Sequence, residues 1–338
     1  MTFLDRLRVA IWRPAIFLVT LLAIAMVAPA LAERLGPDGA PNPTASITNQ
    51  STLLQQMPRI TGRIDIPDTR ASVLIQPAGR TWDYFHEVLL HRGGAVVILG
   101  TLALLALAYL ILGRIRIAAG RSGRKVVRFR SIERFSHWLT AASFVILGLT
   151  GLNITFGKTL LLPLVGPDTF SAIAQAAKYV HNFVSFAFVA GLILIAVLFF
   201  KDNLLERIDV DWLKQGGGFI KSKHAPAGRF NLGEKMVYWL SVAAGIAVSA
   251  SGFLLLFPFY GTNIANMQLA QAVHAIVAIL FIALILAHIY IGTLGMEGAF
   301  EAMGTGEVDL NWAREHHDQW LARNAAGEGG RPSATPAE

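Results

Sequence analysis

The sequence predicts an all-α integral membrane protein, built as a bundle of transmembrane helices. Hydrophobic residues make up 54% of the 338 residues and charged residues only 15%, a balance unlike that of soluble domains. The mean hydropathy is +0.51. Five apolar runs in the later part of the chain each approach the ~20 residues that a helix needs to cross a bilayer. Because lipid offers no hydrogen-bond partners to an open backbone, we expect these runs to be helices.

The residue counts exclude several kinds of site. The chain has no cysteine, which removes disulfides, thiolate zinc sites, protein-ligated iron–sulfur clusters, covalently attached c-type haem and cysteine nucleophiles. Metal chemistry must therefore use the nine histidines or the carboxylates. The net charge of +7 does not indicate nucleic-acid binding, because the basic residues stand beside apolar runs, where membrane topology explains them.

Residues 1–32 have the layout of a secretory signal peptide. Three arginines among residues 1–13 precede an apolar stretch over residues 15–27, and the small-residue sequence Ala-Leu-Ala at residues 30–32 resembles a cleavage site. An uncleaved membrane anchor is the competing interpretation. Under both interpretations the chain that follows begins outside the cytoplasm.

Residues 33–92 are expected to form an extended periplasmic arm. They are rich in Pro, Gly, Thr, Asn and Gln, with little apolar content for a core of their own. Residues 63–76 alternate polar and apolar side chains around a Pro-Asp turn signal, which favours a short hairpin. An arm that lies on a partner subunit and a solvated tether both fit this composition.

The five apolar runs follow the arm. They cover residues 93–112, 138–156, 180–200, 237–257 and 272–292. We assign residues 93–113 to an extra transmembrane helix and residues 137–292 to a core of four helices. A basic loop over residues 114–136 lies between them, and residues 293–338 form a tail.

Loop charges predict the orientation of the bundle. Residues 114–134 carry eight basic residues against the single acidic Glu133, and residues 201–236 carry seven against five. The positive-inside rule therefore places both loops in the cytoplasm. The segment 158–179 holds two basic residues and the segment 258–271 holds none, so we expect both in the periplasm. The mature N-terminus is then periplasmic and the C-terminus cytoplasmic, in a bacterial inner membrane.

Four histidines fall inside or at the ends of the core runs. An ionisable side chain in a membrane span indicates a functional site, because burying it in lipid is costly. His137 and His288 share the cytoplasmic level, and His181 and His274 share the periplasmic level. His274 and His288 are 14 residues apart. On a helix this spacing is about 21 Å, and the two side chains lie within about 40° of the same face.

One helix thus offers an imidazole near each membrane surface, and other helices supply a second imidazole at each level. This pattern fits two b-type haems with bis-histidine axial ligation, and so a four-helix di-haem cytochrome b core. A zinc or copper site fits less well, since two imidazoles per level leave coordination positions unfilled. A proton or ion transporter would want Asp or Glu at the midplane, and the runs contain essentially none.

Six stretches between about residue 126 and residue 321 match a known pattern. They are IERFSHW at 132–138, YVH at 179–181, RFNLGEKMVYW at 229–239, VHA at 273–275, AHIY at 287–290 and WAREHH at 312–317. Together they resemble the gamma subunit, or cytochrome b556 subunit, of membrane-bound formate dehydrogenases. The resemblance is more specific for a di-haem, quinone-linked cytochrome b than for formate as the donor, because related hydrogenase cytochromes share the plan.

The resemblance implies two haem b groups and names their ligands. His137 and His288 would hold the iron on the cytoplasmic side, and His181 and His274 the iron on the periplasmic side. This is the pairing that the depths of the four side chains already indicate.

The resemblance also implies a quinone head group on the cytoplasmic side, near Asn231 and Gly233 and next to His288. An amide can hydrogen-bond a quinone carbonyl, and glycine lets the backbone come close. A helix cap formed by the same two residues is compatible with this role.

An electron-transfer subunit of an oxidoreductase complex follows from the resemblance, rather than a chain with its own substrate-transforming pocket. An iron–sulfur beta subunit and a molybdenum or tungsten catalytic alpha subunit would lie on the periplasmic side. Electrons would cross both haems to menaquinone or ubiquinone. The alternatives are a cytochrome b subunit of a hydrogenase or other molybdoenzyme, and a non-redox membrane anchor or transporter.

The remaining histidines have no expected ligand role. They are His86, His91, His224, His316 and His317. We expect surface or partner contacts for the first two and an interfacial contact for the tail pair. Arg128, Arg130 and Arg134 lie where propionates of the cytoplasmic haem would emerge, so ion pairing there is a hypothesis. For at least two of the three, topology alone is the favoured explanation.

Overall fold

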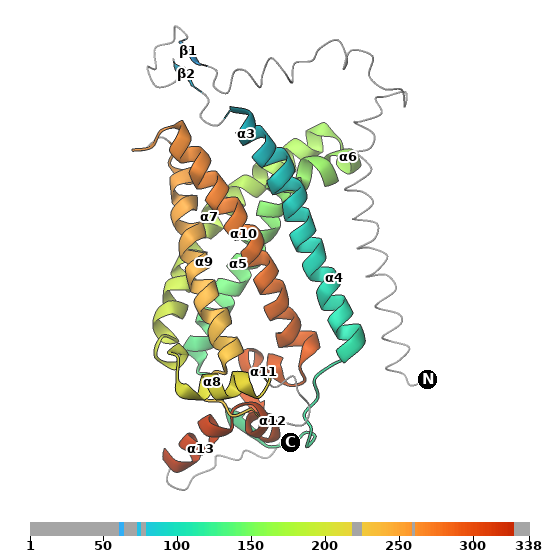
Figure 1. The fold of residues 1–338 in the computed structure, drawn as a ribbon, viewed down its shortest axis with the longest axis vertical. Helices are drawn as coiled ribbons and strands as arrows, with labels where there is room; N and C mark the ends of the chain where they lie inside the picture. The colour runs from blue at the N-terminus through green and yellow to red at the C-terminus, as the bar shows by residue number, and fades with distance from the viewer. Residues whose placement is uncertain (1–60, 64–72, 76–78, 218–224, 259–260, 328–338) are drawn as a thin grey trace. The chain divides into compact units, whose positions relative to one another are not determined.

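The structure is a computed structural model that describes residues 61–63, 73–75, 79–217, 225–258 and 261–327. Within these residues, five helices are long and apolar enough to cross a membrane (Figure 1). They cover Thr81–Leu112, Ser131–Leu160, Pro167–Leu198, Leu232–Leu256 and Ile264–Gly295. The all-α membrane fold is therefore confirmed, with helices that extend beyond the apolar runs. The expected signal peptide lies outside the described residues.

The chain divides into two compact units, and each is considered on its own. The first contains the described residues of Met1–Ala103, Leu149–Val180 and Ser251–Ile279. Its elements are β1 (Thr61–Arg63), β2 (Val73–Ile75), α3 (Gly79–Asp83), η1 (Tyr84–Gly93), α6 (Leu162–Val165) and parts of α4 (Gly94–Leu112), α5 (Ser131–Leu160), α7 (Pro167–Leu198), α9 (Leu232–Leu256) and α10 (Ile264–Tyr290).

The hairpin expected around residues 63–76 is present as two short antiparallel strands. β1 pairs with β2, so that Thr61 lies opposite Ile75 and Arg63 opposite Val73. The first strand begins slightly before the stretch that predicted it. The Pro-Asp turn signal lies outside the described residues.

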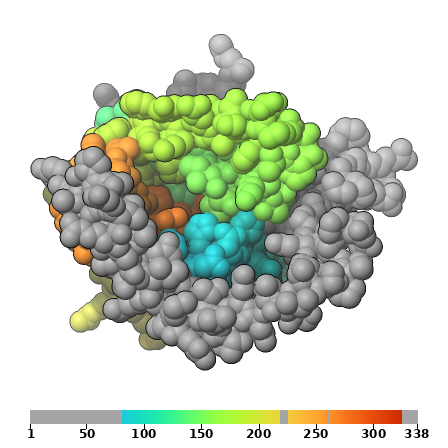
Figure 2. All heavy atoms as spheres, turned by 90° about the horizontal axis from the view of Figure 1, so that it is seen from above, coloured from blue at the N-terminus to red at the C-terminus, as the bar shows by residue number. Residues whose placement is uncertain are grey.

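The π-helical turn η1 continues directly into α4 and packs against the end of α5. His91 on η1 lies 3.1 Å from the hydroxyl of Thr159, and its ring meets the Phe156 ring edge-on at 4.9 Å. A Cβ on Gly94 would lie 2.6 Å from the Ile279 side chain, so this glycine lets α4 approach α10 closely. Figure 2 shows η1 in cyan beside the green residues of the α5–α7 connection.

Glycine and proline make the tight connection between α5 and α7. Gly166 has a φ of 79°, a left-handed conformation that favours glycine. Pro167 then begins α7, where its fixed φ suits the first helical turn and its missing N–H costs nothing. The sequence thereby ends one span and starts the next within a few residues.

α4 is the most exposed of the spans. Gly94 is its only buried residue, although the helix is apolar on every side. Val96 and Ile111 are each 71% exposed. An apolar helix without an inward face of this kind is expected to contact lipid tails along its length.

The second unit contains the described residues of Leu104–Gly148, His181–Ala250 and Leu280–Glu338. Besides the remaining parts of the long helices, its elements are β3 (Lys125–Val127), η2 (Lys201–Asn203), α8 (Arg207–Lys214), η3 (Ile291–Gly295), α11 (Ala299–Gly304), β4 (Glu307–Asp309), α12 (Leu310–His316) and α13 (Asp318–Gly327). Figure 1 shows α8, α11, α12 and α13 gathered at one end of this unit.

The basic loop and the tail, far apart in the sequence, are joined by a small sheet in the second unit. β3 pairs antiparallel with β4, with Val126 opposite Val308. Val308 and Ala313 are completely buried, beside the almost fully buried Trp312. The tail is thus packed as part of the folded unit rather than lying free.

A separate apolar cluster fills the interior of the helices in this unit. Phe188 and Leu192 on α7 pack with Phe281 on α10. Two glycines let α7 approach its neighbours. A Cβ on Gly191 would contact Thr140 on α5, and a Cβ on Gly245 on α9 would lie 2.8 Å from the Leu192 side chain. Close-packed membrane helices commonly use small residues in this way.

Candidate functional site

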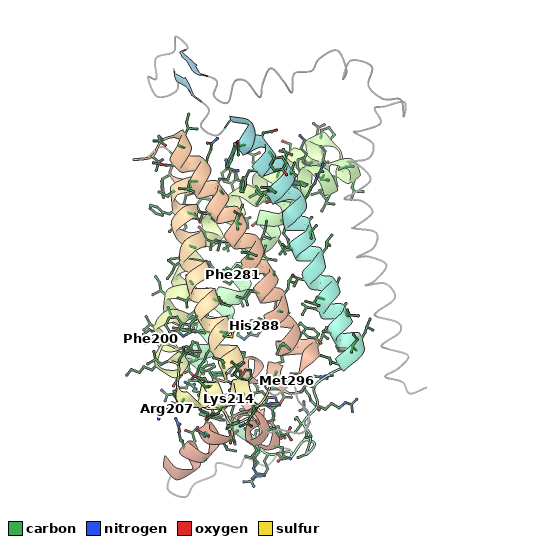
Figure 3. The ribbon with its side chains drawn as sticks, viewed as in Figure 1. Phe200, Arg207, Lys214, Phe281, His288 and Met296 are labelled. Carbon is green, nitrogen blue, oxygen red and sulfur yellow. The ribbon has the colours of Figure 1, made fainter. Side chains whose placement is uncertain are left out.

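His137 and His288 lie close together within the second unit, although 151 residues separate them in the sequence. His137 is near the start of α5 and His288 near the end of α10. The centroids of their rings are 6.2 Å apart, with the ring planes inclined at 58°. In Figure 3, His288 lies nearer than Phe281 to the end of the unit that carries Arg207, Lys214 and Met296.

This separation fits two imidazoles on opposite sides of one iron atom. An imidazole nitrogen lies about 2 Å from a bound transition metal, and the ring centroid lies roughly 1 Å further out. Two opposed rings therefore have centroids about 6 Å apart, close to the 6.2 Å of this pair.

The surroundings of the two rings bear on whether they could hold a cofactor. By residue, His137 is half-buried and His288 exposed. Within the described residues, Nδ1 of His137 is buried without a hydrogen-bond partner. The same residues contain no group of three or more His, Asp or Glu that could hold a metal ion. A porphyrin supplies four ligands of its own, so a haem needs only the two axial imidazoles.

His274 and His181 belong to different units, and each has its own setting. In the first unit, Nδ1 of His274 lies 3.2 Å from the hydroxyl of Ser251. A Cβ on Gly252 would lie 3.1 Å from the same ring, so glycine leaves room for the imidazole on α9. His181 is half-buried on α7 in the second unit.

Asn231 caps the N-terminus of α9. Its side-chain oxygen accepts a hydrogen bond from the backbone N–H of Glu234 at 3.0 Å, and the Glu234 carboxylate accepts one from the backbone N–H of Asn231 at 3.0 Å. This reciprocal capping box satisfies two backbone donors at the helix start. A Cβ on Gly233 would lie 3.4 Å from the Trp212 ring, which brings α8 against this turn.

A network of buried charges surrounds this cap. Arg128 is 5% exposed, and its guanidinium donates to the Glu234 carboxylate at 3.0 Å and to the backbone carbonyl of Arg229 at 2.9 Å. Arg229 in turn donates to Glu133 at 2.8 Å and to Asp202 at 2.6 Å. From the sequence alone, the carboxylates of this network have no expected role.

These contacts bear on the three arginines that were considered for haem propionates. Arg128 is engaged by Glu234, and Arg134 donates to the backbone carbonyl of Gly304 at 2.6 Å. Arg130 is exposed. Two of the three are therefore held by protein partners.

His317 is the residue whose expected environment was wrong. Instead of lying at an interface, it is completely buried at the end of α12. Its Nδ1 lies 3.0 Å from the carbonyl oxygen of Gly228, and its Nε2 lies 3.7 Å from the Glu234 carboxylate. Burial, and then the Arg128 charge, lower the pKa of His317 to about 3. Trp312 packs on the ring at 5.1 Å, and a large aromatic side chain in the tail is the signal that could have indicated burial there.

The other histidines have local partners or lie outside the described residues. His86 lies 3.0 Å from the carboxylate of the neighbouring Glu87, and His91 contacts Thr159. His224 is outside the described residues.

Membrane-bound b-type cytochromes are bundles of apolar helices in which imidazoles from two spans lie close enough to hold one iron between them. The arrangement of His137 and His288 is of this class. Residues 128–306, more than half of the chain, match the family described as prokaryotic cytochrome b561. The chain belongs to this family. Membership implies haem b as the cofactor.

The chain is also similar to named subunits of formate dehydrogenases. It is 29% identical over 199 residues to the cytochrome b556(fdo) subunit of Escherichia coli K12, which covers 58% of this chain and 91% of that protein. Identity to the nitrate-inducible cytochrome b556(Fdn) subunit of the same organism is 27% over 203 residues, covering 58% and 90%. A formate dehydrogenase cytochrome b556 subunit of Haemophilus influenzae is 27% identical over 202 residues, covering 58% and 82%. The resemblance recognised in the sequence is thereby confirmed.

Proposed function

We propose that the chain is the di-haem cytochrome b subunit of a membrane-bound formate dehydrogenase complex. The names of its relatives support formate as the electron donor. The 6.2 Å separation between the rings of His137 and His288 is the observation that carries the redox role. The chain would pass electrons from a periplasmic iron–sulfur subunit to quinone, while a molybdenum or tungsten subunit oxidises formate.

Four imidazoles would hold the two haem irons in this function. His137 and His288 would hold one haem iron, and His181 and His274 the other. The 14-residue spacing of the two histidines on α10 supports the second pair, because it puts both side chains on one face of the helix. When bound, haem supplies one-electron transfer, and two histidine ligands on its iron would suit electron transfer rather than oxygen chemistry.

The orientation in the bacterial inner membrane follows from the basic loop. Its eight basic residues, at 114–134, favour the cytoplasmic side for the end that carries His137 and His288. The arm over residues 33–92 would then be periplasmic, where it is available to the soluble subunits. Formate oxidation outside and quinone protonation from the cytoplasm would separate charge across the membrane.

The quinone is assigned to the turn at Asn231 and Gly233. The side-chain oxygen of Asn231 is engaged in the helix cap, so its NH₂ group is the part that would donate to a quinone carbonyl. The cap fixes the direction of that NH₂ group, since the amide is planar. Capping and quinone binding therefore use different atoms of one side chain.

Haem content of the purified full-length chain tests the redox role. A pyridine haemochrome assay is expected to give two haems b per polypeptide. His288→Ala is expected to lose one haem, because the iron loses an axial ligand. His86→Ala is the matched control and should retain both. A wild-type chain without haem would overturn the proposal in favour of a non-redox anchor or transporter.

Two substitutions at one position separate quinone binding from helix capping. Asn231→Ser keeps an N-cap oxygen but lacks an amide donor, whereas Asn231→Ala lacks both. The serine variant is expected to have normal haem spectra and weaker affinity for a quinone analogue, measured by fluorescence quenching or by inhibition. Unchanged affinity in the serine variant would leave Asn231 with its capping role only.

The soluble partners can be identified after purification in mild detergent. The complex is expected to contain molybdenum or tungsten, iron–sulfur clusters and formate-dependent haem reduction. Reduction by hydrogen instead of formate would assign the chain to a hydrogenase complex.

A further inference from the structure

The imidazole of His274 on α10 lies against two consecutive residues of α9, Ser251 and Gly252, within the first unit. His274 is half-buried, and Ser251 is 5% exposed. Nδ1 of His274 lies 3.2 Å from the hydroxyl oxygen of Ser251, a hydrogen-bond distance between residues 23 positions apart. The contact therefore joins two membrane spans at the one ring.

Gly252 leaves the space that this ring needs beside α9. A Cβ at Gly252 would lie 3.1 Å from Cε1 and 3.4 Å from Nδ1 of His274. A side chain at this position would be fixed to the backbone of α9, so the imidazole would have to shift or turn to make room. The missing Cβ thus sets how closely the ring approaches α9, while Ser251 holds one of its nitrogens.

The hydrogen bond bears on which nitrogen of His274 can bind a metal. A neutral imidazole has one nitrogen that carries hydrogen and one that is basic, and the metal takes the basic nitrogen. A serine hydroxyl can accept the hydrogen of Nδ1, which leaves the lone pair of Nε2 for the metal. Histidines that bind metals almost always donate their other N–H to an oxygen in this way. The contact with Ser251 matches that arrangement.

We propose that Ser251 and Gly252 are positioning residues for the haem ligand His274. Ser251 accepts the hydrogen of Nδ1 and so presents Nε2 to the iron, and Gly252 sets the orientation of the ring. This inference rests on the proposed function, in which His274 is a ligand. It gives a role to α9, a helix that contains no histidine of its own.

The hydrogen bond has a consequence for the potential of the haem that His274 would hold. An oxygen acceptor on Nδ1–H raises the basicity of the imidazole, so the ring donates more electron density to the iron. This stabilises the oxidised iron, which carries the greater positive charge, more than the reduced iron. Loss of the acceptor is therefore expected to make one-electron reduction of this haem easier.

A potentiometric titration of the purified full-length chain, followed by haem absorbance, tests the role of Ser251. In Ser251→Ala the equilibrium constant for reducing one of the two haems is expected to rise by about three- to tenfold, a positive shift of up to about 59 mV. The other haem should keep its potential. Ser251→Thr retains a hydroxyl and should stay near the wild-type values.

Ser143→Ala on α5 is the matched control for Ser251→Ala. Ser143 is also buried, at 4% exposed, but its hydroxyl donates to the carbonyl oxygen of Leu139 in its own helix at 2.7 Å. The substitution removes the same hydroxyl from another membrane helix. Both haem potentials are expected to stay at their wild-type values in this variant.

Electron paramagnetic resonance of the oxidised chain tests the role of Gly252. The signal of a low-spin ferric haem depends on the angle between the planes of its two axial imidazoles. Gly252→Ala is expected to shift the signal of one haem, because the added Cβ turns the ring of His274. Gly100→Ala on α4 is the matched control, since a Cβ there would meet no atom within 4 Å, and it should leave both signals unchanged.

The outcomes separate this inference from the proposed function. Two haems with wild-type potentials in Ser251→Ala would overturn the role of Ser251 and leave the haem assignment intact, as an unchanged resonance signal in Gly252→Ala would for Gly252. Loss of one haem in Ser251→Ala but not in Ser251→Thr would support a role for the hydroxyl, whereas loss in both would overturn it. A wild-type chain that lacks haem would overturn the proposed function as well.

Discussion

At the scale of single residues, buried charges are held by opposite charges. Lys235 is 2% exposed, and its ammonium group donates to Asp209 at 2.8 Å and to the carbonyl oxygen of Leu204 at 2.9 Å. Removing one partner of such a pair commonly costs about 3–5 kcal/mol, because the other charge stays buried alone. This pair ties α8 to the start of α9, beside the proposed quinone turn.

Gly191 is the residue whose substitution tests helix packing most directly. A Cβ at this position would meet the side chain and backbone of Thr140 on α5, and backbone atoms cannot move aside. Gly191→Ala is expected to lower the free energy of unfolding by about 1–3 kcal/mol, as overpacking does. Thermal unfolding in detergent, followed by circular dichroism, measures the change.

Gly100 on α4 provides the matched control for Gly191. A Cβ there would have no atom within 4 Å. Gly100→Ala is therefore expected to be neutral or stabilising by about 1 kcal/mol through helix propensity alone. Equal losses in both variants would contradict the close contact of α5 with α7.

At the scale of elements, the tail docks on the basic loop through β3, β4 and α12. Asp309 joins them, since its carboxylate accepts hydrogen bonds from the backbone N–H of Ser122 at 2.9 Å and of Asn311 at 2.8 Å. Burial raises the pKa of Asp309, and the hydrogen bonds from Ser122 and Asn311 outweigh burial, so this pKa lies below its usual value. One carboxylate thus closes the loop and caps the following helix.

Asp309→Ala is expected to release the tail from the loop. The variant loses the cap of α12 and leaves buried N–H groups without an acceptor, a loss of about 2 kcal/mol or more. Limited proteolysis should cut the tail faster than in the wild type. Asp309→Asn retains one acceptor oxygen, so its rate of tail cleavage should lie between those of the wild type and Asp309→Ala. Identical cleavage in all three proteins would refute the docking role.

Docking of the tail is expected to depend on pH through His317. Its pKa is about 3 when folded and 6.5 in the unfolded chain, so the unfolded tail binds a proton that the folded tail excludes. The contribution of His317 to the free energy of unfolding is complete above pH 6.5 and falls as the pH drops toward 3. The loss is about 1.4 kcal/mol at pH 5.5. Proteolysis of the tail should accelerate at pH 5.5 relative to pH 7.5.

Two glutamine variants show whether this pH dependence belongs to His317. His317→Gln has no group that titrates in the range and should lose the acceleration. His316→Gln should keep it. Loss of the acceleration in the second variant alone would transfer the effect to His316.

At the scale of the whole molecule, the five spans and their loops define which segments share a side of the membrane. The described spans leave the α5–α7 connection and the basic loop at opposite ends of α5, a helix of 30 residues. At 1.5 Å per residue this helix is about 45 Å long, more than the ~30 Å of a hydrocarbon core. The two connections are therefore expected in water on opposite sides.

The absence of cysteine makes this topology directly testable. Single cysteines at exposed positions, Thr169→Cys in the first turn of α7 and Arg124→Cys in the basic loop, provide the only thiols in the chain. A membrane-impermeant maleimide applied to intact spheroplasts is expected to label the first. The second should react only after the membrane is permeabilised. The reverse pattern would invert the orientation.

The sequence by itself determined the fold class and the candidate ligands. Apolar runs of about 20 residues give membrane helices in any tertiary arrangement, because lipid cannot satisfy an open backbone. The spacing of His274 and His288 along one helix is equally independent of the neighbouring helices. The proximity of His137 and His288 also followed from the sequence, because both residues were expected at the same end of their membrane helices.

Tertiary structure alone decided how the tail packs and how the turn at Asn231 is built. The burial of His317 against Glu234 depends on β3 pairing with β4, a contact between segments about 180 residues apart, and no local pattern encodes such a pairing. The same holds for Arg128. The sequence explains its charge by membrane topology or by a haem propionate, whereas in the fold its guanidinium is bonded to Glu234. Periodicity and charge counts report on a helix and its membrane; the partners of a buried polar group are fixed only when distant segments pack together.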